Sequence, residues 1–224
     1  MTTNEPRFWA VILIGPPGAG KDTQAGLLSE ELGLFEIKTS AIIDQNFKAS
    51  PDDPIIKEQV ERKQRGEMVE PQLVLSWVLS EIKNRAGLRE GIVMSGSPRT
   101  MPEASAEMPV LKQLYGENLK IVYLSVNEEE AVKRNAGRRI CQANRHPIPN
   151  FPEFQDLTAC PKDGSPIIKR IDDAPETLHK RYQVYLKETT PVLDFLSKEG
   201  YNIIQINGEK TIEDVHRDIL DHLW

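Results

Sequence analysis

The chain has 224 residues, of which 39% are hydrophobic and 28% charged, a composition typical of globular proteins and a length that suits one domain with inserted subdomains. Its net charge of −6 at pH 7 provides no basic field for nucleic acids, and no apolar run approaches the roughly 20 residues that cross a bilayer, so we expect neither nucleic acid nor membrane as a partner. The polar residues before Phe8 do not form an export signal, which favours the cytoplasm, where disulfides are rare.

Short β-rich runs alternate with longer helical patterns, which predicts an α/β protein built on a mostly parallel sheet. Several of these runs are apolar without alternation, as expected for strands that helices cover on both faces. The predicted strands are Trp9–Ile14, Leu34–Lys38, Gly91–Met94, Ile121–Val126 and Asn202–Ile206.

A helical insertion is predicted between Ala41 and Ala86, where apolar residues repeat at helical spacing. Pro51, Pro54 and Pro71 stand where its helices would begin, because the first helical position tolerates proline.

A further amphipathic helix is predicted from Pro175 to Lys198, with Pro191 marking a kink or break within it. Its apolar stripe comprises Leu178, Tyr182, Tyr185, Leu186, Leu193 and Leu196. Before it, residues 141–166 are rich in proline and lack helical periodicity, so we expect an irregular or small β subdomain that acts as a lid.

The run Gly15-Pro16-Pro17-Gly18-Ala19-Gly20-Lys21 follows the first predicted strand and precedes a helical pattern, which is the context of a phosphate-binding loop. Its glycines would let backbone N–H groups turn inward around an anion, while Lys21 reaches the transferred phosphate. The alternative is a simple Gly/Pro turn. Asp22 stands where the general pattern places Ser or Thr for magnesium, and Thr23 follows one residue later.

The run from Gly15 to Gln24 resembles the fingerprint of the adenylate kinase family, which also places its threonine one position later. Ser95-Gly96-Ser97-Pro98-Arg99-Thr100 is similar to the family's Asp-Gly-Phe-Pro-Arg-Thr signature, and Gly137-Arg138-Arg139 resembles the beginning of its lid. With Arg170-Ile171-Asp172-Asp173 and Arg181, these motifs follow the family order across nearly the whole chain.

The resemblance implies a P-loop three-layer α/β fold with a central parallel five-stranded sheet, a helical NMP-binding insertion and a lid insertion. It implies one kinase domain over residues 1–224, with a core of 1–37, 70–136 and 174–224, an NMP-binding subdomain at 38–69 and a lid at 137–173. It further implies a monomer that moves the terminal phosphoryl group of ATP to AMP, giving two ADP, with Mg²⁺ bound to ATP.

The site residues follow from the same resemblance. Arginine suits phosphoryl transfer because its planar fork binds phosphate oxygens bidentately. The catalytic set is Lys21, Arg99, Arg134, Arg138, Arg170 and Arg181. The ATP-binding set is Gly15, Gly18, Ala19, Gly20, Lys21, Asp22, Thr23, Arg138 and Lys210. The acceptor-binding set is Thr39, Met68, Val69, Gly96, Arg99, Glu103, Arg170 and Arg181.

Several residues depart from the family pattern at the acceptor and metal sites. Asp44 stands where a phosphate-binding arginine is expected, unless a one-turn shift brings Lys48 into that role. Glu103 replaces the glutamine that reads adenine, and a carboxylate could instead accept from another amino-bearing base, such as cytosine. Ser95 replaces the aspartate that positions magnesium, and Asp22 either takes over that role or complements the positive end of its helix.

Two rival functions therefore stay open beside AMP phosphorylation. One is a kinase for another nucleoside monophosphate. The other is a catalytically degenerate protein that binds ATP and serves a regulatory role, against which the presence of Lys21 and the arginines argues.

The two cysteines stand in the predicted lid, where some family members hold a structural zinc ion through paired Cys-x-x motifs. Here the motifs are Cys141-x-x-Asn144 and Cys160-x-x-Asp163, and His146 lies close enough to replace Asn144. Cys141, His146, Cys160 and Asp163 make a chemically reasonable zinc-binding set. The alternative is a metal-free lid held by hydrogen bonds, with both thiols free.

Overall fold

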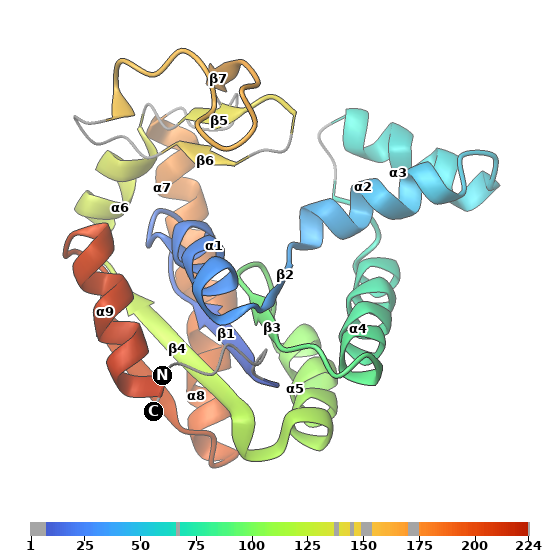
Figure 1. Cartoon of the computed structure of the whole chain (residues 1–224). Helices are drawn as coiled ribbons and strands as arrows, with labels where there is room; N and C mark the ends of the chain where they lie inside the picture. The colour runs from blue at the N-terminus through green and yellow to red at the C-terminus, as the bar shows by residue number, and fades with distance from the viewer. Residues whose placement is uncertain are drawn as a thin grey trace. The chain divides into compact units, whose positions relative to one another are not determined.

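The computed structural model describes residues 8–65, 68–136, 139–143, 146–148, 154–169 and 175–223. Its central sheet is parallel, with five strands in the order β2-β3-β1-β4-β8 (Figure 1). These strands are β1 (Ala10–Ile14), β2 (Phe35–Ile37), β3 (Ile92–Met94), β4 (Leu119–Ser125) and β8 (Ile203–Asn207). Each begins and ends within two residues of a predicted strand, so the α/β class and the sheet are confirmed.

The apolar run of β1 is buried because β1 is an interior strand of the sheet. Its five residues are all at most 2% exposed, and it pairs in parallel with β3 in the register Ala10 to Ile92. The phosphate-binding loop begins where β1 ends and leads into α1 (Lys21–Leu32). None of the helices in the described part of the chain combines the length and apolarity that a membrane crossing requires.

The chain divides into two compact units, and the first comprises Met1–Leu13 with Ala25–Ile121. Its helices are α2 (Thr39–Ala49), α3 (Pro54–Gln64), α4 (Pro71–Gly87) and α5 (Met101–Tyr115), and a 3₁₀ turn follows at Gly116–Asn118. Figure 1 shows α2 and α3 side by side.

Pro54 and Pro71 begin helices as predicted, whereas the prediction for Pro51 was wrong. Pro51 lies in a turn before α3. The helix begins three residues later because the Asp53 carboxylate caps it, accepting from the N–H groups of Ile55 and Ile56 at 2.8 and 3.4 Å.

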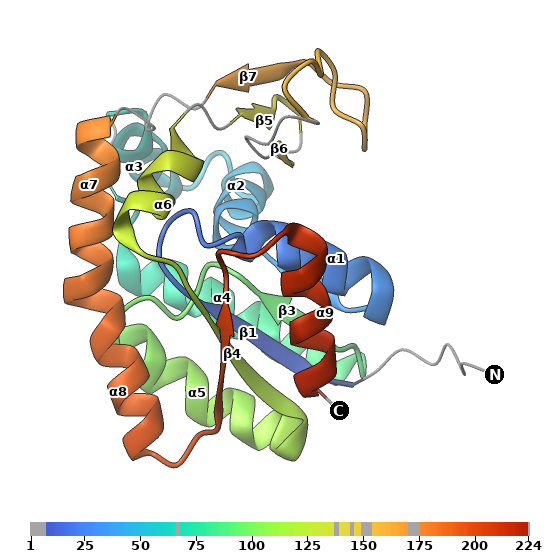
Figure 2. The ribbon, with the colours of Figure 1, turned by 90° about the vertical axis from the view of Figure 1, so that its left-hand side faces the viewer.

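The second unit comprises Ile14–Gln24 with Val122–Trp224. The predicted small β subdomain is confirmed as an antiparallel sheet of β5 (Arg139–Cys141), β6 (Pro147–Ile148) and β7 (Ile167–Lys169), in the order β6-β5-β7. The helices of this unit are α6 (Glu128–Asn135), α7 (Pro175–Val184), α8 (Thr190–Lys198) and α9 (Ile212–Leu223). Figure 2 shows α6 beside α7.

The predicted break near Pro191 takes the form of a π-helical turn at Tyr185–Thr189, which joins α7 to α8. Leu178, Tyr185 and Leu196 of the predicted stripe are buried. Leu186 was wrongly assigned to the stripe, since it is 43% exposed. It lies in the π turn, whose wider winding departs from the 3.6 residues per turn that the pattern assumed.

Candidate active site

Two glycines of the phosphate-binding loop have no room for a side chain. A Cβ atom on Gly15 would lie 2.5 Å from the carbonyl oxygen of Leu124, and one on Gly18 would lie 2.6 Å from Nδ2 of Asn135. Gly18 also has a φ of +88°, a conformation that L-residues rarely adopt. The loop therefore packs its backbone directly against β4 and α6.

The side chain of Lys21 curls back over this loop. Its ammonium donates to the carbonyl oxygens of Gly15 and Pro16 at 2.7 and 2.8 Å. A positive charge is thus held at the loop, at the point where the sequence predicts that phosphate oxygens bind.

The residues just after Lys21 differ in exposure. Asp22 is exposed in the first turn of α1, while Thr23 is half-buried. Gln24 is buried and joins α1 to α9, because its Nε2 donates to the carbonyl oxygen of Ile212 at 2.9 Å and its Oε1 lies 3.1 Å from Nδ1 of His216.

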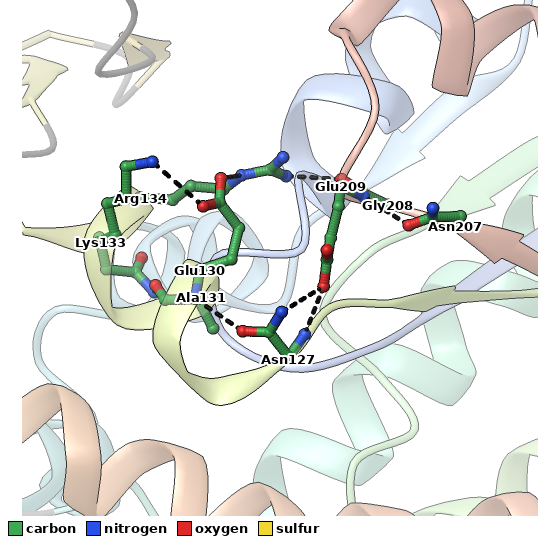
Figure 3. Close-up of polar contacts among 9 residues, drawn as sticks. Asn127, Glu130, Ala131, Lys133, Arg134, Asn207, Gly208 and Glu209 are labelled. Atoms are coloured by element: carbon green, nitrogen blue, oxygen red, sulfur yellow. Dashed lines mark hydrogen bonds and ion pairs between the residues drawn. The ribbon is translucent and has the colours of Figure 1, made fainter.

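Arg134, a predicted catalytic arginine, is held on two sides (Figure 3). Its Nε donates to Oε1 of Glu130 at 2.7 Å, and its Nη1 donates to the carbonyl oxygen of Gly208 at 2.6 Å. Burial alone would raise the pKa of Glu130, but the hydrogen bond and charge of Arg134 lower it. The guanidinium is therefore oriented by a carboxylate and a carbonyl oxygen, and its side chain is only 16% exposed.

Gly208 lies against the phosphate-binding loop. Its N–H donates to the carbonyl oxygen of Ser125 at 2.9 Å, and a Cβ atom there would lie 3.4 Å from the carbonyl oxygen of Ala19. Two residues later, the ammonium of Lys210, a predicted ATP ligand, donates to Oδ2 of Asp218 on α9 at 2.6 Å. In this unit the structure therefore brings together the loop, Arg134 and the turn at Gly208.

The remaining predicted arginines on this side are less informative. Arg181 is half-buried in the last turn of α7. Arg138 and Arg170 lie outside the described residues.

Three predicted acceptor-binding residues come together in the other unit. Thr39 begins α2, and Gly96 follows the end of β3. A Cβ atom on Gly96 would lie 3.1 Å from Oγ1 of Thr39 and 3.5 Å from Nη2 of Arg99. A hydroxyl group and an exposed guanidinium thus flank a stretch of backbone that carries no side chain, an arrangement that can bind a phosphate or a base edge.

Glu103, predicted to read the acceptor base, caps α5 in the structure. Its Oε2 accepts from the N–H groups of Arg99 and Thr100 at 2.5 and 3.1 Å, and Thr100 completes a capping box with the N–H of Glu103. The motif T-x-x-E is a capping signal, and the sequence prediction overlooked it. Glu103 therefore orients the backbone that carries Arg99.

The other predicted acceptor residues differ in environment. Val69 is buried at 8% exposure, whereas Met68 is 76% exposed. Asp44 is bound by the ammonium of Lys63 from α3, and that ammonium also lies 5.5 Å from the centre of the Phe47 ring. The sequence prediction considered Lys48 and missed Lys63, because no local spacing relates Asp44 to a residue on the next helix.

A buried carboxyl group lies behind the segment that carries Arg99. Ser95 and Ser97 are 3% and 5% exposed, and the hydroxyl of Ser97 donates to Oε1 of Glu107 at 2.5 Å. Glu107 is fully buried, and burial raises its pKa to about 8 despite the hydrogen bond from Ser97. At neutral pH this carboxyl group is therefore protonated.

The four predicted lid ligands lie together. One ligand atom from each of Cys141, His146, Cys160 and Asp163 lies within 4.8 Å of the others. Nδ1 of His146 is 3.4 Å from Sγ of Cys160 and 3.2 Å from Oδ2 of Asp163. The Cys141 thiol donates to the same Asp163 oxygen at 3.4 Å. This group of residues could hold a metal ion.

The lid cysteines are buried and not joined by a disulfide bond. They form a small core with Ile148, against which Phe154, Leu157 and Ile167 pack. Burial raises the pKa of the Cys160 thiol. Asn144, the alternative fourth ligand, lies outside the described residues.

A glycine-lined phosphate loop that holds a lysine, with an arginine-bearing helix packed on it, defines a P-loop enzyme of the phosphotransferase class. The family model for adenylate kinase matches residues 13–201. The chain belongs to the adenylate kinase family.

Relatives match almost the full chain. It is 34% identical over 211 residues to an adenylate kinase of Methanocella arvoryzae, which covers 93% of this chain and 95% of the relative. It is 33% identical over 217 residues to an adenylate kinase of Bacillus subtilis, covering 95% and 97%. An adenylate kinase of Staphylococcus aureus is 32% identical over 216 residues, covering 95% and 98%.

Proposed function

We propose that this chain catalyses the reversible transfer of the terminal phosphoryl group of ATP to AMP, giving two ADP. The observation that carries the proposal is the phosphate loop, in which Gly15 and Gly18 leave the backbone bare and Lys21 supplies a positive charge. Membership of the adenylate kinase family, with relatives of that name across the full length, supports the ATP:AMP reaction.

The protein's part in this chemistry is alignment and neutralisation of charge, because phosphoryl transfer offers little covalent work to side chains. Lys21 would bind the transferred phosphoryl group, and the loop's N–H groups would bind the neighbouring phosphates. Thr39, Gly96 and Arg99 would hold the acceptor. The catalytic arginines proposed from the family resemblance are Arg99, Arg134, Arg138, Arg170 and Arg181.

The proposed division of labour follows the inserted segments. Residues 38–69 would cover the acceptor and residues 137–173 would cover ATP, so that closure excludes water from the transferred phosphoryl group. We propose that the protein does this as a cytoplasmic monomer.

Magnesium bound with ATP would neutralise charge on the phosphate oxygens. Since Ser95 is a buried hydroxyl at the position of the family's aspartate, we propose that the exposed carboxylate of Asp22 takes over the positioning of magnesium through water. The alternative is that Asp22 only complements the positive end of α1. An unchanged magnesium dependence of Asp22→Gly would favour that alternative.

The lid ligands fit a structural zinc ion. Two thiols, an imidazole and a carboxylate are ligands that zinc takes in tetrahedral sites, with bonds of about 2.0–2.3 Å. Their ligand atoms already lie within 4.8 Å of one another, so small shifts would bring them round one ion. We propose that zinc links β5 to the segment at Cys160 and makes the lid rigid.

The test is to incubate the purified protein with ATP, Mg²⁺ and each of AMP, CMP, UMP and GMP, and to quantify the nucleoside diphosphates. Preferred turnover of AMP, lost in Lys21→Met, supports the proposal. ATP binding without turnover of any acceptor would favour the degenerate binding protein.

A kinase for another nucleoside monophosphate is the second candidate, and two contacts favour it. Glu103 caps α5 with one carboxylate oxygen, and Lys63 neutralises Asp44 at the position of the family's phosphate-binding arginine. Preferred turnover of CMP in the same assay would establish this candidate over AMP.

A further inference from the structure

Helix α6 is attached to the turn after β8 by an exposed carboxylate. Oε1 of Glu209 accepts hydrogen bonds from the backbone N–H of Asn127 at 2.9 Å and from its side-chain Nδ2 at 2.8 Å. Asn127 is also the N-cap of α6, since its Oδ1 accepts from the N–H of Glu130 at 2.9 Å. Glu209 therefore fixes the residue from which the helix begins (Figure 3).

The far end of α6 is attached to the neighbouring residue of the same turn. There Nη1 of Arg134 donates to the carbonyl oxygen of Gly208 at 2.6 Å. The turn itself is stabilised by the side chain of Asn207, whose Oδ1 accepts from the N–H of Glu209 at 3.0 Å. Two consecutive residues, Gly208 and Glu209, thus hold both ends of one short helix.

Both partners of this attachment also contact the phosphate-binding loop. Ala131 and Asn135 of α6 would lie within 2.7 Å of a Cβ atom on Gly18, and Gly208 packs near the carbonyl oxygen of Ala19. A displacement of α6 or of the turn would therefore move a wall of the loop. The position of Arg134 beside the loop depends on both.

We propose that Glu209 is a positioning residue for ATP, acting through Asn127 and α6 on Arg134 and the phosphate-binding loop. The proposal rests on the proposed function, because it assigns ATP to this loop. Geometry is the reason for it: the first turn of α6 already carries Glu128, Glu129 and Glu130, so the helix dipole does not need a further carboxylate. The part that Glu209 supplies is a contact from another element.

The experiment compares three variants of the full chain by calorimetric titration with ATP. Glu209→Ala should weaken ATP binding roughly three- to tenfold, the range that one or two exposed hydrogen bonds provide. Glu209→Gln keeps an acceptor oxygen and should bind within about twofold of the wild type. Glu213→Ala, which removes an exposed carboxylate from the first turn of α9, is the matched control and should bind as the wild type does.

The acceptor provides the second readout. With Glu209→Ala, the KM for AMP should stay within about twofold of the wild type while ATP binding weakens, because the hydrogen bonds lost are those that hold the ATP side. Equal weakening of both nucleotides, or ATP binding by Glu209→Ala that equals the Glu213→Ala control, would overturn the proposal. The ATP titration needs no turnover, so it decides the role of Glu209 even where the kinase assay finds no product.

Discussion

The ammonium of Lys63 on α3 binds the carboxylate of Asp44 on α2, and the two side chains are 42% and 43% exposed. Asp44 stands where the family resemblance expects a cation for the acceptor's phosphate. The ion pair therefore neutralises a negative charge that would otherwise repel that phosphate, and it occupies Lys63 in doing so.

Replacing Asp44 with asparagine should tighten acceptor binding. Asp44→Asn removes the negative charge and releases Lys63, so we expect the KM for AMP to fall about threefold, in keeping with exposed charges. The KM for ATP should not change. Steady-state kinetics at low and high salt measure both, and the gain should shrink at high salt. Glu58→Gln, an exposed residue of α3, is the control, and an equal gain there would refute a specific role for Asp44.

Glu107 should make stability depend on pH. Its pKa of about 8 in the folded chain lies above the ordinary value of 4.5, so the folded state keeps a proton that the unfolded state loses. The stability it contributes is fully present below pH 4.5 and is lost as pH rises to about 8, at up to about 1.4 kcal/mol per pH unit.

Glu107→Gln does not titrate and isolates this effect. Between pH 5 and pH 8, the free energy of unfolding of the wild type should fall relative to that of Glu107→Gln by up to about 4 kcal/mol. Urea unfolding of both proteins at several pH values measures the difference. Parallel curves for the two proteins would show that the carboxyl group is already ionised at pH 5.

Much of the fold follows from the sequence, because apolar strands and glycine patterns are local signals. The run from Gly15 to Lys21 and the lid residues from Cys141 to Asp163 were found by their spacing. The pattern could not show that Glu107 is buried, since a glutamate on a helix is expected to face solvent.

Contacts between distant residues account for most of what the sequence did not reveal. Asn127 and Glu209 are 82 positions apart, so no motif joins them, and only the packing of α6 beside the turn after β8 brings them together. Asp44 and Lys63 meet for the same reason, across two helices. The register of Leu186 failed because a π turn is not visible in a pattern of period 3.6.

The lid cluster should hold about one zinc ion per chain. Cys160→Ser should lose the metal and lower the Tm by roughly 5 °C or more, since bound metal stabilises the folded state. Zinc released on denaturation, measured with a chromogenic chelator, gives the stoichiometry. His146→Ala should also lose zinc, whereas Asn144→Ala should keep it. The reverse result would make Asn144 the fourth ligand, and a wild type without zinc would leave the lid metal-free.

Two glycines of the phosphate loop should respond differently to the same substitution. Gly18 and Gly20 have similar φ values of +88° and +85°, so alanine is strained at both by about 1–2 kcal/mol. At Gly18 the added Cβ also meets Nδ2 of Asn135 at 2.6 Å and the carbonyl oxygen of Ala131 at 2.7 Å, whereas nothing lies within 4 Å at Gly20.

Gly18→Ala must therefore push the loop away from α6, and we expect ATP affinity to fall at least about tenfold further than in Gly20→Ala, the loss that 1.4 kcal/mol of misplacement produces. Calorimetric titration with ATP measures both, and thermal unfolding separates loop distortion from loss of fold. Equal affinities in the two variants would mean that α6 yields to the added methyl group, and that the close packing of Gly18 on this helix does not position the phosphates.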